Sequence, residues 1–141
     1  NDTLNTKKTI DYLKTKWKND FSDPLIWADG SGVSRYNLLT PTVIVDALQK
    51  TYSILGWEKI TALFPAGGIS GTILNYHKDA SSPYVFAKTG TLKNNISLSG
   101  FFIGKNNRIY VFSILVNNHT SSSEAVREGI ATLIRFFRKK Y

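Results

Sequence analysis

Hydrophobic residues near the start of the chain recur at helical spacing. Ile10, Leu13 and Trp17 stand at positions i, i+3 and i+7, which predicts an amphipathic helix over residues 6–19. Residues 24–34 show no such period and contain the sequence Asp-Gly-Ser-Gly, which is typical of a turn. A loop is therefore predicted there.

A longer helical pattern follows this loop. Thr40 before Pro41 is typical of a helix start, because threonine caps the first turn and proline lacks an N–H that would have no partner there. Apolar residues continue at helical spacing to about Gly56. A short further helix is predicted over residues 57–64, ended by Pro-Ala-Gly-Gly.

The pattern changes to strands from residue 84. Strands are predicted over residues 84–87, 98–103 and 109–116, with a Lys-Thr-Gly-Thr sequence at the end of the first. Gly-Lys-Asn-Asn between the last two has the chemistry of a hairpin turn. Short connections between strands imply antiparallel pairing, so a three-stranded antiparallel sheet is expected.

A final helix is predicted to cover one face of this sheet. Ser121, with Glu124 three residues later, resembles a capping box at its start. The apolar face of the helix is predicted to consist of Val126, Gly129, Ile130, Leu133, Ile134 and Phe137. The fold class is therefore α+β: N-terminal helices, a three-stranded antiparallel sheet and a covering C-terminal helix. Because residues 84–87 are apolar on both faces, the second face or an edge is expected to stay bare unless a second copy or an N-terminal piece covers it.

Composition limits the class of protein. The chain has 141 residues, 42% of them hydrophobic, which suits one domain with its own core. It has no cysteine, which excludes disulfides and thiolate zinc sites. The two histidines and ten acidic residues show no metal-ligand spacing, so neither a metal nor a cofactor is expected. His77 and His119 are both interpreted as exposed loop residues.

Three short motifs carry the chemistry. Residues 29–37 read Asp-Gly-Ser-Gly-Val-Ser-Arg-Tyr-Asn, a glycine-rich turn that presents a hydroxyl and a carboxamide before a helix. Residues 64–72 read Phe-Pro-Ala-Gly-Gly-Ile-Ser-Gly-Thr, and residues 88–91 read Lys-Thr-Gly-Thr. A strand edge with the last motif suits an extended ligand that pairs through backbone hydrogen bonds.

In this order the motifs resemble the D-Ala-D-Ala carboxypeptidase/endopeptidase family, the class C low-molecular-mass penicillin-binding proteins. The likeness extends from about Trp27 to Val116 and includes the following Asn117-Asn118. It implies a penicillin-binding-protein/β-lactamase-like sheet and a serine peptidase that works through an acyl-enzyme. It also implies peptidoglycan stem peptides ending in D-Ala-D-Ala as substrate, β-lactams as ligands, and a periplasmic or other extracytoplasmic location in the cell envelope.

The resemblance gives catalytic roles to two residues of the first motif. Ser34 would relay a proton to the leaving amine, and Asn37 would hold the substrate's peptide carbonyl. The family's usual Ser-x-Asn spacing is not kept, since Tyr36 stands at the third place. The register is then Ser-x-x-Asn or the pair lies elsewhere, and Ser31 remains a competitor to Ser34.

The third motif would hold the carboxylate side of the substrate. Lys88 would supply positive potential as a catalytic residue. Thr89 and Thr91 would bind the terminal carboxylate through their hydroxyls, and Gly90 would allow the ligand to approach closely.

The family's Ser-x-x-Lys nucleophile motif is absent from the sequence. No serine in this chain has a lysine three residues later. Residues 1–141 are therefore predicted to be the C-terminal segment of a single penicillin-recognising domain whose nucleophile lies upstream. The isolated chain is predicted to be inactive, because a serine needs an adjacent base to attack an amide.

Two further interpretations stay open. The net charge of +8 suits a non-catalytic basic module that binds an anionic wall polymer or nucleic acid. However, the aromatic residues are not interleaved with the lysines in a nucleic-acid motif, so no nucleic-acid partner is expected. The chain could also descend from the peptidase and serve as a scaffold without catalysis.

Overall fold

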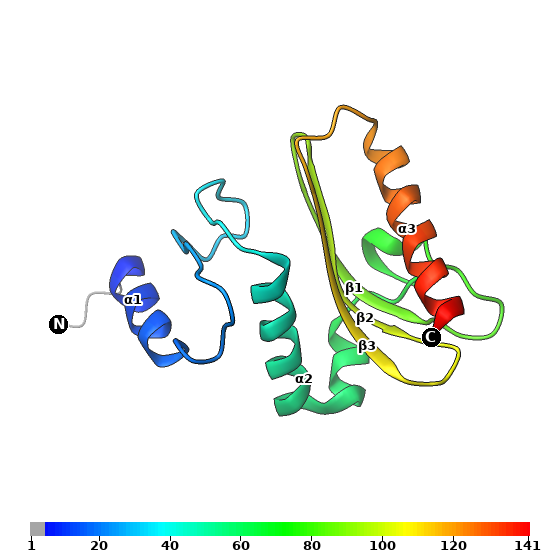
Figure 1. The fold of residues 1–141 in the computed structure, drawn as a ribbon, viewed down its shortest axis with the longest axis horizontal. Coiled ribbons are helices and arrows are strands. Elements are labelled where there is room, and N and C mark those ends of the chain that lie inside the picture. The colour runs from blue at the N-terminus through cyan, green and yellow to red at the C-terminus, as the bar shows by residue number, and fades with distance from the viewer. Residues whose placement is uncertain (1–4) are drawn as a thin grey trace.

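The computed structural model describes residues 5–141 (Figure 1). The elements in chain order are helices α1 (Thr6–Lys16) and α2 (Pro41–Leu63), the 3-10 helix η1 (Gly71–Ile73), strands β1 (Val85–Leu92), β2 (Asn95–Ile103) and β3 (Ile109–Asn117), and helix α3 (Ser123–Lys140). This order confirms the α+β prediction. Among the described helices, none combines the length and apolar character that crossing a bilayer requires.

The three strands form one antiparallel sheet in the order β1-β2-β3. The first two strands are joined by a tight turn in which Asn94 has a φ of 61°. The Lys-Thr-Gly-Thr motif therefore lies inside β1 and is paired with β2, whereas the sequence pattern placed it at the strand's end. The pattern missed this hairpin because its strands are rich in polar side chains here, and backbone ladders form without apolar residues.

Helices cover both faces of the sheet from within the chain (Figure 1). On one face, Leu48 and Ile60 of α2 pack against Phe101 of β2. On the other face, Ile130 and Ile134 of α3 belong to the cluster that contains Val85, Ala87 and Leu98. The first alternative expected from the sequence, a bare second face, is therefore wrong, because α2 folds back onto it. The second alternative, an edge without a partner strand, agrees with the described sheet. In the described part of the chain, the outer edges of β1 and β3 have no partner strand, apart from one isolated bridge between Ala66 and Phe86.

The start and the break of α2 agree with the sequence pattern. Thr40 caps the helix, since its hydroxyl accepts a hydrogen bond of 3.2 Å from the Val43 N–H. Gly56 has non-helical dihedrals, with φ 74°, and divides the helix at the predicted boundary. This kink allows both halves of α2 to pack on the same face of the sheet, through Leu48 before Gly56 and Ile60 after it.

The start and the buried face of α3 differ from the prediction. Ser122 is the N-cap in place of Ser121, because the Ser122 hydroxyl accepts from the Ala125 N–H at 3.2 Å. The buried residues are Ile130, Ala131 and Ile134, whereas Leu133 and Phe137 are 42% and 37% exposed. The helix is turned so that a small alanine side chain faces the sheet.

Candidate active site

The loop between α1 and α2 is held in shape by its own polar groups. The Asp29 carboxylate accepts hydrogen bonds from the backbone N–H of Ser31 at 2.9 Å and from its hydroxyl at 2.7 Å. The hydroxyl bond is the main reason that the pKa of Asp29 lies below its usual range. An ionised aspartate therefore fixes the glycine-rich turn at neutral pH.

Asn37 closes the base of this loop. Its side-chain oxygen accepts from the N–H groups of Ala28 at 2.7 Å and Asp29 at 3.2 Å, and its NH2 donates to the Asp29 carbonyl at 3.1 Å. An antiparallel bridge between Ile26 and Leu38 lies beside it. These contacts show a bracing role for the carboxamide in addition to the substrate contact that the resemblance implies.

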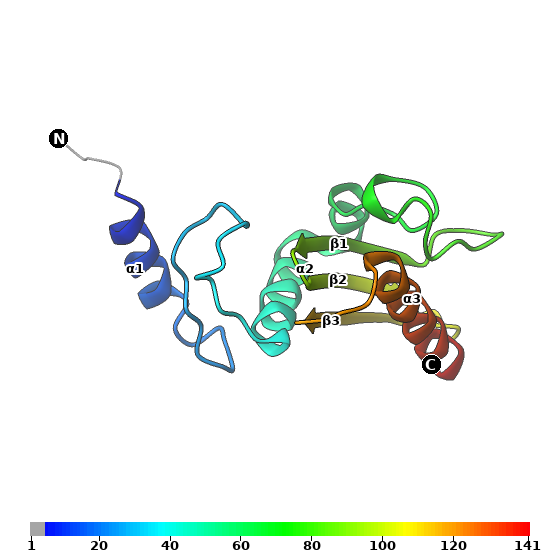
Figure 2. The same cartoon turned by 90° about the horizontal axis from the view of Figure 1, so that it is seen from above.

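In Figure 2 this loop lies beyond the end of the sheet toward which β1 runs. An open cleft of about 490 Å³ is lined by residues of the loop and of this end of the sheet. Ser34 and Asn37 line it from the loop, and Gly90 and Thr91 line it from β1. The backbone N–H of Tyr36 donates to the Ser34 hydroxyl at 3.2 Å, which orients its oxygen.

The competitor Ser31 is placed differently. Its hydroxyl donates to the Asp29 carboxylate, and it is not among the residues that line the cleft.

Strand alternation divides the Lys-Thr-Gly-Thr motif between the two sheet faces. Phe86 packs edge-on against Trp57 of α2, with ring centroids 5.2 Å apart, so Lys88 and Gly90 share the α2 face with it. Thr89 and Thr91 share the α3 face. A Cβ atom at position 90 would collide with the Ser97 hydroxyl on β2, so any other residue here would require Ser97 to change rotamer.

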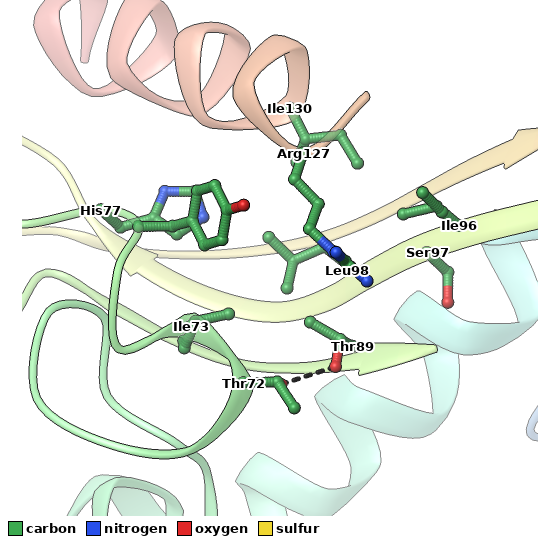
Figure 3. A pocket seen from close by; sticks show the side chains of 10 residues that line it. Thr72, Ile73, His77, Thr89, Ile96, Ser97, Leu98, Arg127 and Ile130 are labelled. Atoms are coloured by element: carbon green, nitrogen blue, oxygen red, sulfur yellow. Dashed lines mark hydrogen bonds between the residues drawn. The ribbon is translucent and has the colours of Figure 1, made fainter. Parts of the chain in front are cut away.

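The hydroxyl of each threonine of the motif has a hydrogen-bond partner, and Figure 3 shows the partner of Thr89. The Thr89 and Thr72 hydroxyls are hydrogen bonded at 2.6 Å, and the Arg127 guanidinium donates to the Thr91 hydroxyl at 3.3 Å. The sequence analysis assigned no role to Thr72 or Arg127. Thr72 lies in the motif of residues 64–72, so its position was a usable signal, but nothing in the sequence distinguishes Arg127.

The motif of residues 64–72 supports the first half of β1. The Ala87 N–H donates to the Pro65 carbonyl at 3.0 Å, and the Gly67 N–H donates to the Val85 carbonyl at 2.9 Å. This motif therefore runs along the outer edge of β1, which has no partner strand. It places the Thr72 hydroxyl within hydrogen-bond distance of the Thr89 hydroxyl.

Lys88 contacts its own strand in this structure. Its ammonium donates to the Thr89 carbonyl at 2.9 Å, and it is not among the residues that line the cleft. The structure thus brings Ser34, Asn37, Gly90 and Thr91 to one cleft. That the Lys88 ammonium and the Ser34 hydroxyl meet in this cleft stays a prediction. It requires the Lys88 side chain to leave the Thr89 carbonyl and adopt another rotamer.

Comparison with known sequences gives a consistent set of relatives. Residues 20–140 match the model of the D-Ala-D-Ala carboxypeptidase 3 (S13) family. The chain is 32% identical over 121 residues to the D-alanyl-D-alanine carboxypeptidase DacB of Haemophilus influenzae, covering 82% of this chain and 25% of the relative. It is 35% identical over 114 residues to a D-alanyl-D-alanine carboxypeptidase of an Actinomadura species, covering 76% and 21%.

A solved structure has the same fold. Penicillin binding protein 4 (dacB) from Haemophilus influenzae, in a complex with a β-lactam, matches with a TM-score of 0.75 and 26% identity. The match covers 90% of this chain and 32% of that one. The chain thus spans about a quarter of the length of the first curated relatives and about a third of this structure.

Proposed function

This chain belongs to the D-Ala-D-Ala carboxypeptidase 3 (S13) family, and from this premise we propose that it forms the C-terminal part of a serine-type D-Ala-D-Ala carboxypeptidase or endopeptidase. The observation that carries the proposal is the cleft in which Ser34 and Asn37 face Gly90 and Thr91. Segments more than fifty residues apart in sequence meet there, and both belong to motifs that the family shares.

The nucleophile and its base would come from another part of the same domain. The sequence contains no Ser-x-x-Lys, and the curated relatives are about four times as long as the matched region. We propose that residues 1–141 are the C-terminal segment of this domain and that an upstream helix places the nucleophilic serine in the cleft.

The reaction would run in two steps, each with a role for this chain. First, the upstream serine oxygen bonds to the carbonyl carbon of the penultimate D-Ala, and the C–N bond to the terminal D-Ala breaks. The serine proton passes to the upstream base, and the leaving amine takes a proton through the Ser34 hydroxyl. Water then hydrolyses the ester, which releases the shortened peptide and restores the serine.

The third motif would hold the substrate during these steps. The absence of a side chain on Gly90 lets an extended peptide approach the edge of β1. The Thr91 hydroxyl, fixed by Arg127, would meet the negative terminal carboxylate where Thr91 lines the cleft. Lys88 would add positive potential from the α2 face after a change of rotamer. Thr89, which shares the α3 face with Thr91, would hold β1 against Thr72.

The substrate and location follow from the same family relationship. A peptidoglycan stem peptide ending in D-Ala-D-Ala is the proposed substrate, and β-lactams would form a stable acyl-enzyme. Support for the latter comes from the relative that was solved with a bound β-lactam. An enzyme with this substrate would act in the periplasm or another extracytoplasmic part of the cell envelope, and we propose this location.

The test uses the full-length protein that carries this chain. Replacement of Ser34 by alanine is expected to lower kcat for D-Ala release from a D-Ala-D-Ala peptide by about a hundredfold or more, because the leaving amine loses its proton donor. Ser31→Ala is the matched control and should keep kcat within a few-fold. Wild-type activity in Ser34→Ala would refute the assigned role.

A second measurement tests whether the nucleophile lies outside residues 1–141. Intact-mass spectrometry after incubation with a fluorescent penicillin should show acylation of the full-length protein and none of the 141-residue chain alone. Stoichiometric acylation of the chain alone would place the nucleophile within residues 1–141 and overturn the proposal.

A further inference from the structure

Arg127 carries a positive charge from α3 to the third motif. Its side chain is half-buried and extends from the helix toward the sheet (Figure 3). The guanidinium donates to the Thr91 hydroxyl at 3.3 Å, and Thr91 lines the cleft together with Gly90. Lys88, the cation of the motif itself, donates to the Thr89 carbonyl and does not line the cleft. In this structure the positive charge that contacts a cleft-lining side chain of the motif is therefore that of Arg127.

The contact with Arg127 leaves the proton of the Thr91 hydroxyl available. A hydroxyl has one proton to donate and two lone pairs that accept. Arg127 occupies one lone pair, and within residues 5–141 the Thr91 hydroxyl forms no other hydrogen bond. The Thr89 hydroxyl, by contrast, is paired with the Thr72 hydroxyl at 2.6 Å. A carboxylate in the cleft can therefore accept the Thr91 proton, and the neighbouring guanidinium strengthens this donor.

No other charge competes with Arg127 in the small pocket between η1, the sheet and α3. Of the described residues that line this pocket, Arg127 is the only charged one. His77 also lines it and is only 6% exposed, so its interpretation as an exposed loop residue is wrong. Burial, together with the charge of Arg135, lowers the pKa of His77 to about 4, so this imidazole is neutral at pH 7.

The acidic residues around Arg127 do not neutralise it by direct contact. Glu124 and Glu128 are its acidic neighbours along α3, and in the described part of the chain neither forms a salt bridge with it. On the cleft side, the described lining residues include Arg35 and no acidic residue. An anionic group that enters the cleft therefore meets positive potential from Arg35 on the loop and from Arg127 behind Thr91.

From these contacts we propose that Arg127 is a positioning residue that sets a preference for a free carboxylate on the leaving residue of the substrate. This inference rests on the proposed function. The guanidinium holds the Thr91 oxygen, so the hydroxyl proton is directed to the carboxylate, and its charge offsets that of the carboxylate. A carboxamide at the same place carries no net charge and therefore gains little from Arg127.

Two peptides and the full-length protein that carries this chain test the inference. Both peptides end in D-Ala-D-Ala, and they differ only in a C-terminal carboxylate or carboxamide, so cleavage releases D-Ala or D-alaninamide. The wild type is expected to prefer the carboxylate peptide. Arg127→Gln should raise KM for this peptide by about tenfold or more, keep its kcat within a few-fold, and leave kcat/KM for the carboxamide peptide within about twofold.

Three further variants separate positioning from a structural role. Arg127→Lys keeps the charge and should restore part of the preference. Arg135→Gln removes an exposed arginine of the same helix whose guanidinium contacts Thr132, and it should leave the preference unchanged. In a Thr91→Val background, Arg127→Gln should have no further effect on the preference, because Arg127 acts through the Thr91 hydroxyl.

Each alternative outcome has a distinct meaning. A general loss of structure around β1 would slow the cleavage of both peptides equally, so an equal loss in Arg127→Gln overturns the inference. An unchanged preference in Arg127→Gln, or additive effects of Thr91→Val and Arg127→Gln, also overturns it. A wild type that cleaves both peptides equally well refutes the inference alone. A wild type that cleaves neither peptide refutes the proposed function, and the inference with it.

Discussion

The two segments that face each other across the cleft are stabilised in different ways. Strand β1 is held by the core, since Val85 and Ala87 are fully buried. The loop of residues 29–37 is held by hydrogen bonds within itself, and its apolar side chains Val33 and Tyr36 are 68% and 79% exposed. The position of β1 is therefore a property of the whole fold, whereas the shape of the loop is a local property.

The loop is joined to the rest of the molecule mainly through α2. The Ser22 N–H donates to the Asp46 carboxylate at 2.7 Å, and the Thr40 hydroxyl donates to Asp23 at 2.7 Å. On the other side of the loop, the rings of Trp17 and Trp27 stack with centroids 6.4 Å apart. Polar contacts at the surface are weaker than core packing. The loop should therefore open locally while the sheet stays folded.

The largest expected effect is in the core beneath β1. Phe101 is 2% exposed and contacts the rings of Trp57 and Phe64, so Phe101→Ala should lower the free energy of unfolding by about 3–5 kcal/mol. Urea denaturation measures this change. Phe136→Ala, at a position that is 59% exposed, is the control and should change stability by less than about 0.5 kcal/mol. Equal losses of unfolding free energy in the two variants would show that the packing around Phe101 does not stabilise the sheet.

The pH dependence of stability should come from the β1 side. The pKa of His77 is about 4 in the folded protein and 6.5 when unfolded. A depressed folded pKa means that stability is complete above pH 6.5 and falls as the pH drops toward 4, by about 3 kcal/mol in total. The lowered pKa of Asp29 in the loop matters only below its ordinary value of 3.8, so the loop is unaffected in this window.

Comparison with His77→Asn measures this contribution. Asparagine tolerates the positive φ of 58° at this position and does not titrate. The difference in unfolding free energy between pH 7 and pH 4.5 should be about 2 kcal/mol smaller in the variant than in the wild type. Parallel pH profiles would contradict the burial of His77.

The loop should open without unfolding of the sheet. Asn37→Ala removes the hydrogen bonds to Ala28 and Asp29, so the amides of these two residues should exchange with solvent about tenfold faster. Global stability should change by about 1 kcal/mol or less. Ser34→Ala, which removes one acceptor in the same loop, is the control, and unchanged exchange in Asn37→Ala would show that the amide does not brace the loop.

The sequence predicted the structure correctly where a residue type has a well-defined local role, such as a helix cap or a helix break. Thr40 before Pro41 and the break at Gly56 fixed the course of α2, and three ordered motifs identified the family. It was uninformative where partners come from distant segments. The burial of His77 depends on how residues 65–84 fold around it, and the contact of Arg127 with Thr91 depends on the rotation of α3. No local pattern records either.

The smallest expected effect concerns the contact that links the motif of residues 64–72 to β1. Thr72→Val and Thr89→Val each keep the side-chain shape and remove one hydroxyl of the 2.6 Å hydrogen bond. Because the contact is exposed to solvent, a double-mutant cycle should give a coupling energy of only about 0.5–1 kcal/mol in unfolding free energy. The pair Thr15→Val and Thr89→Val joins residues on separate elements and should show no coupling. Coupling between Thr72 and Thr89 that is indistinguishable from this control would mean that the edge of β1 is held by backbone bonds alone.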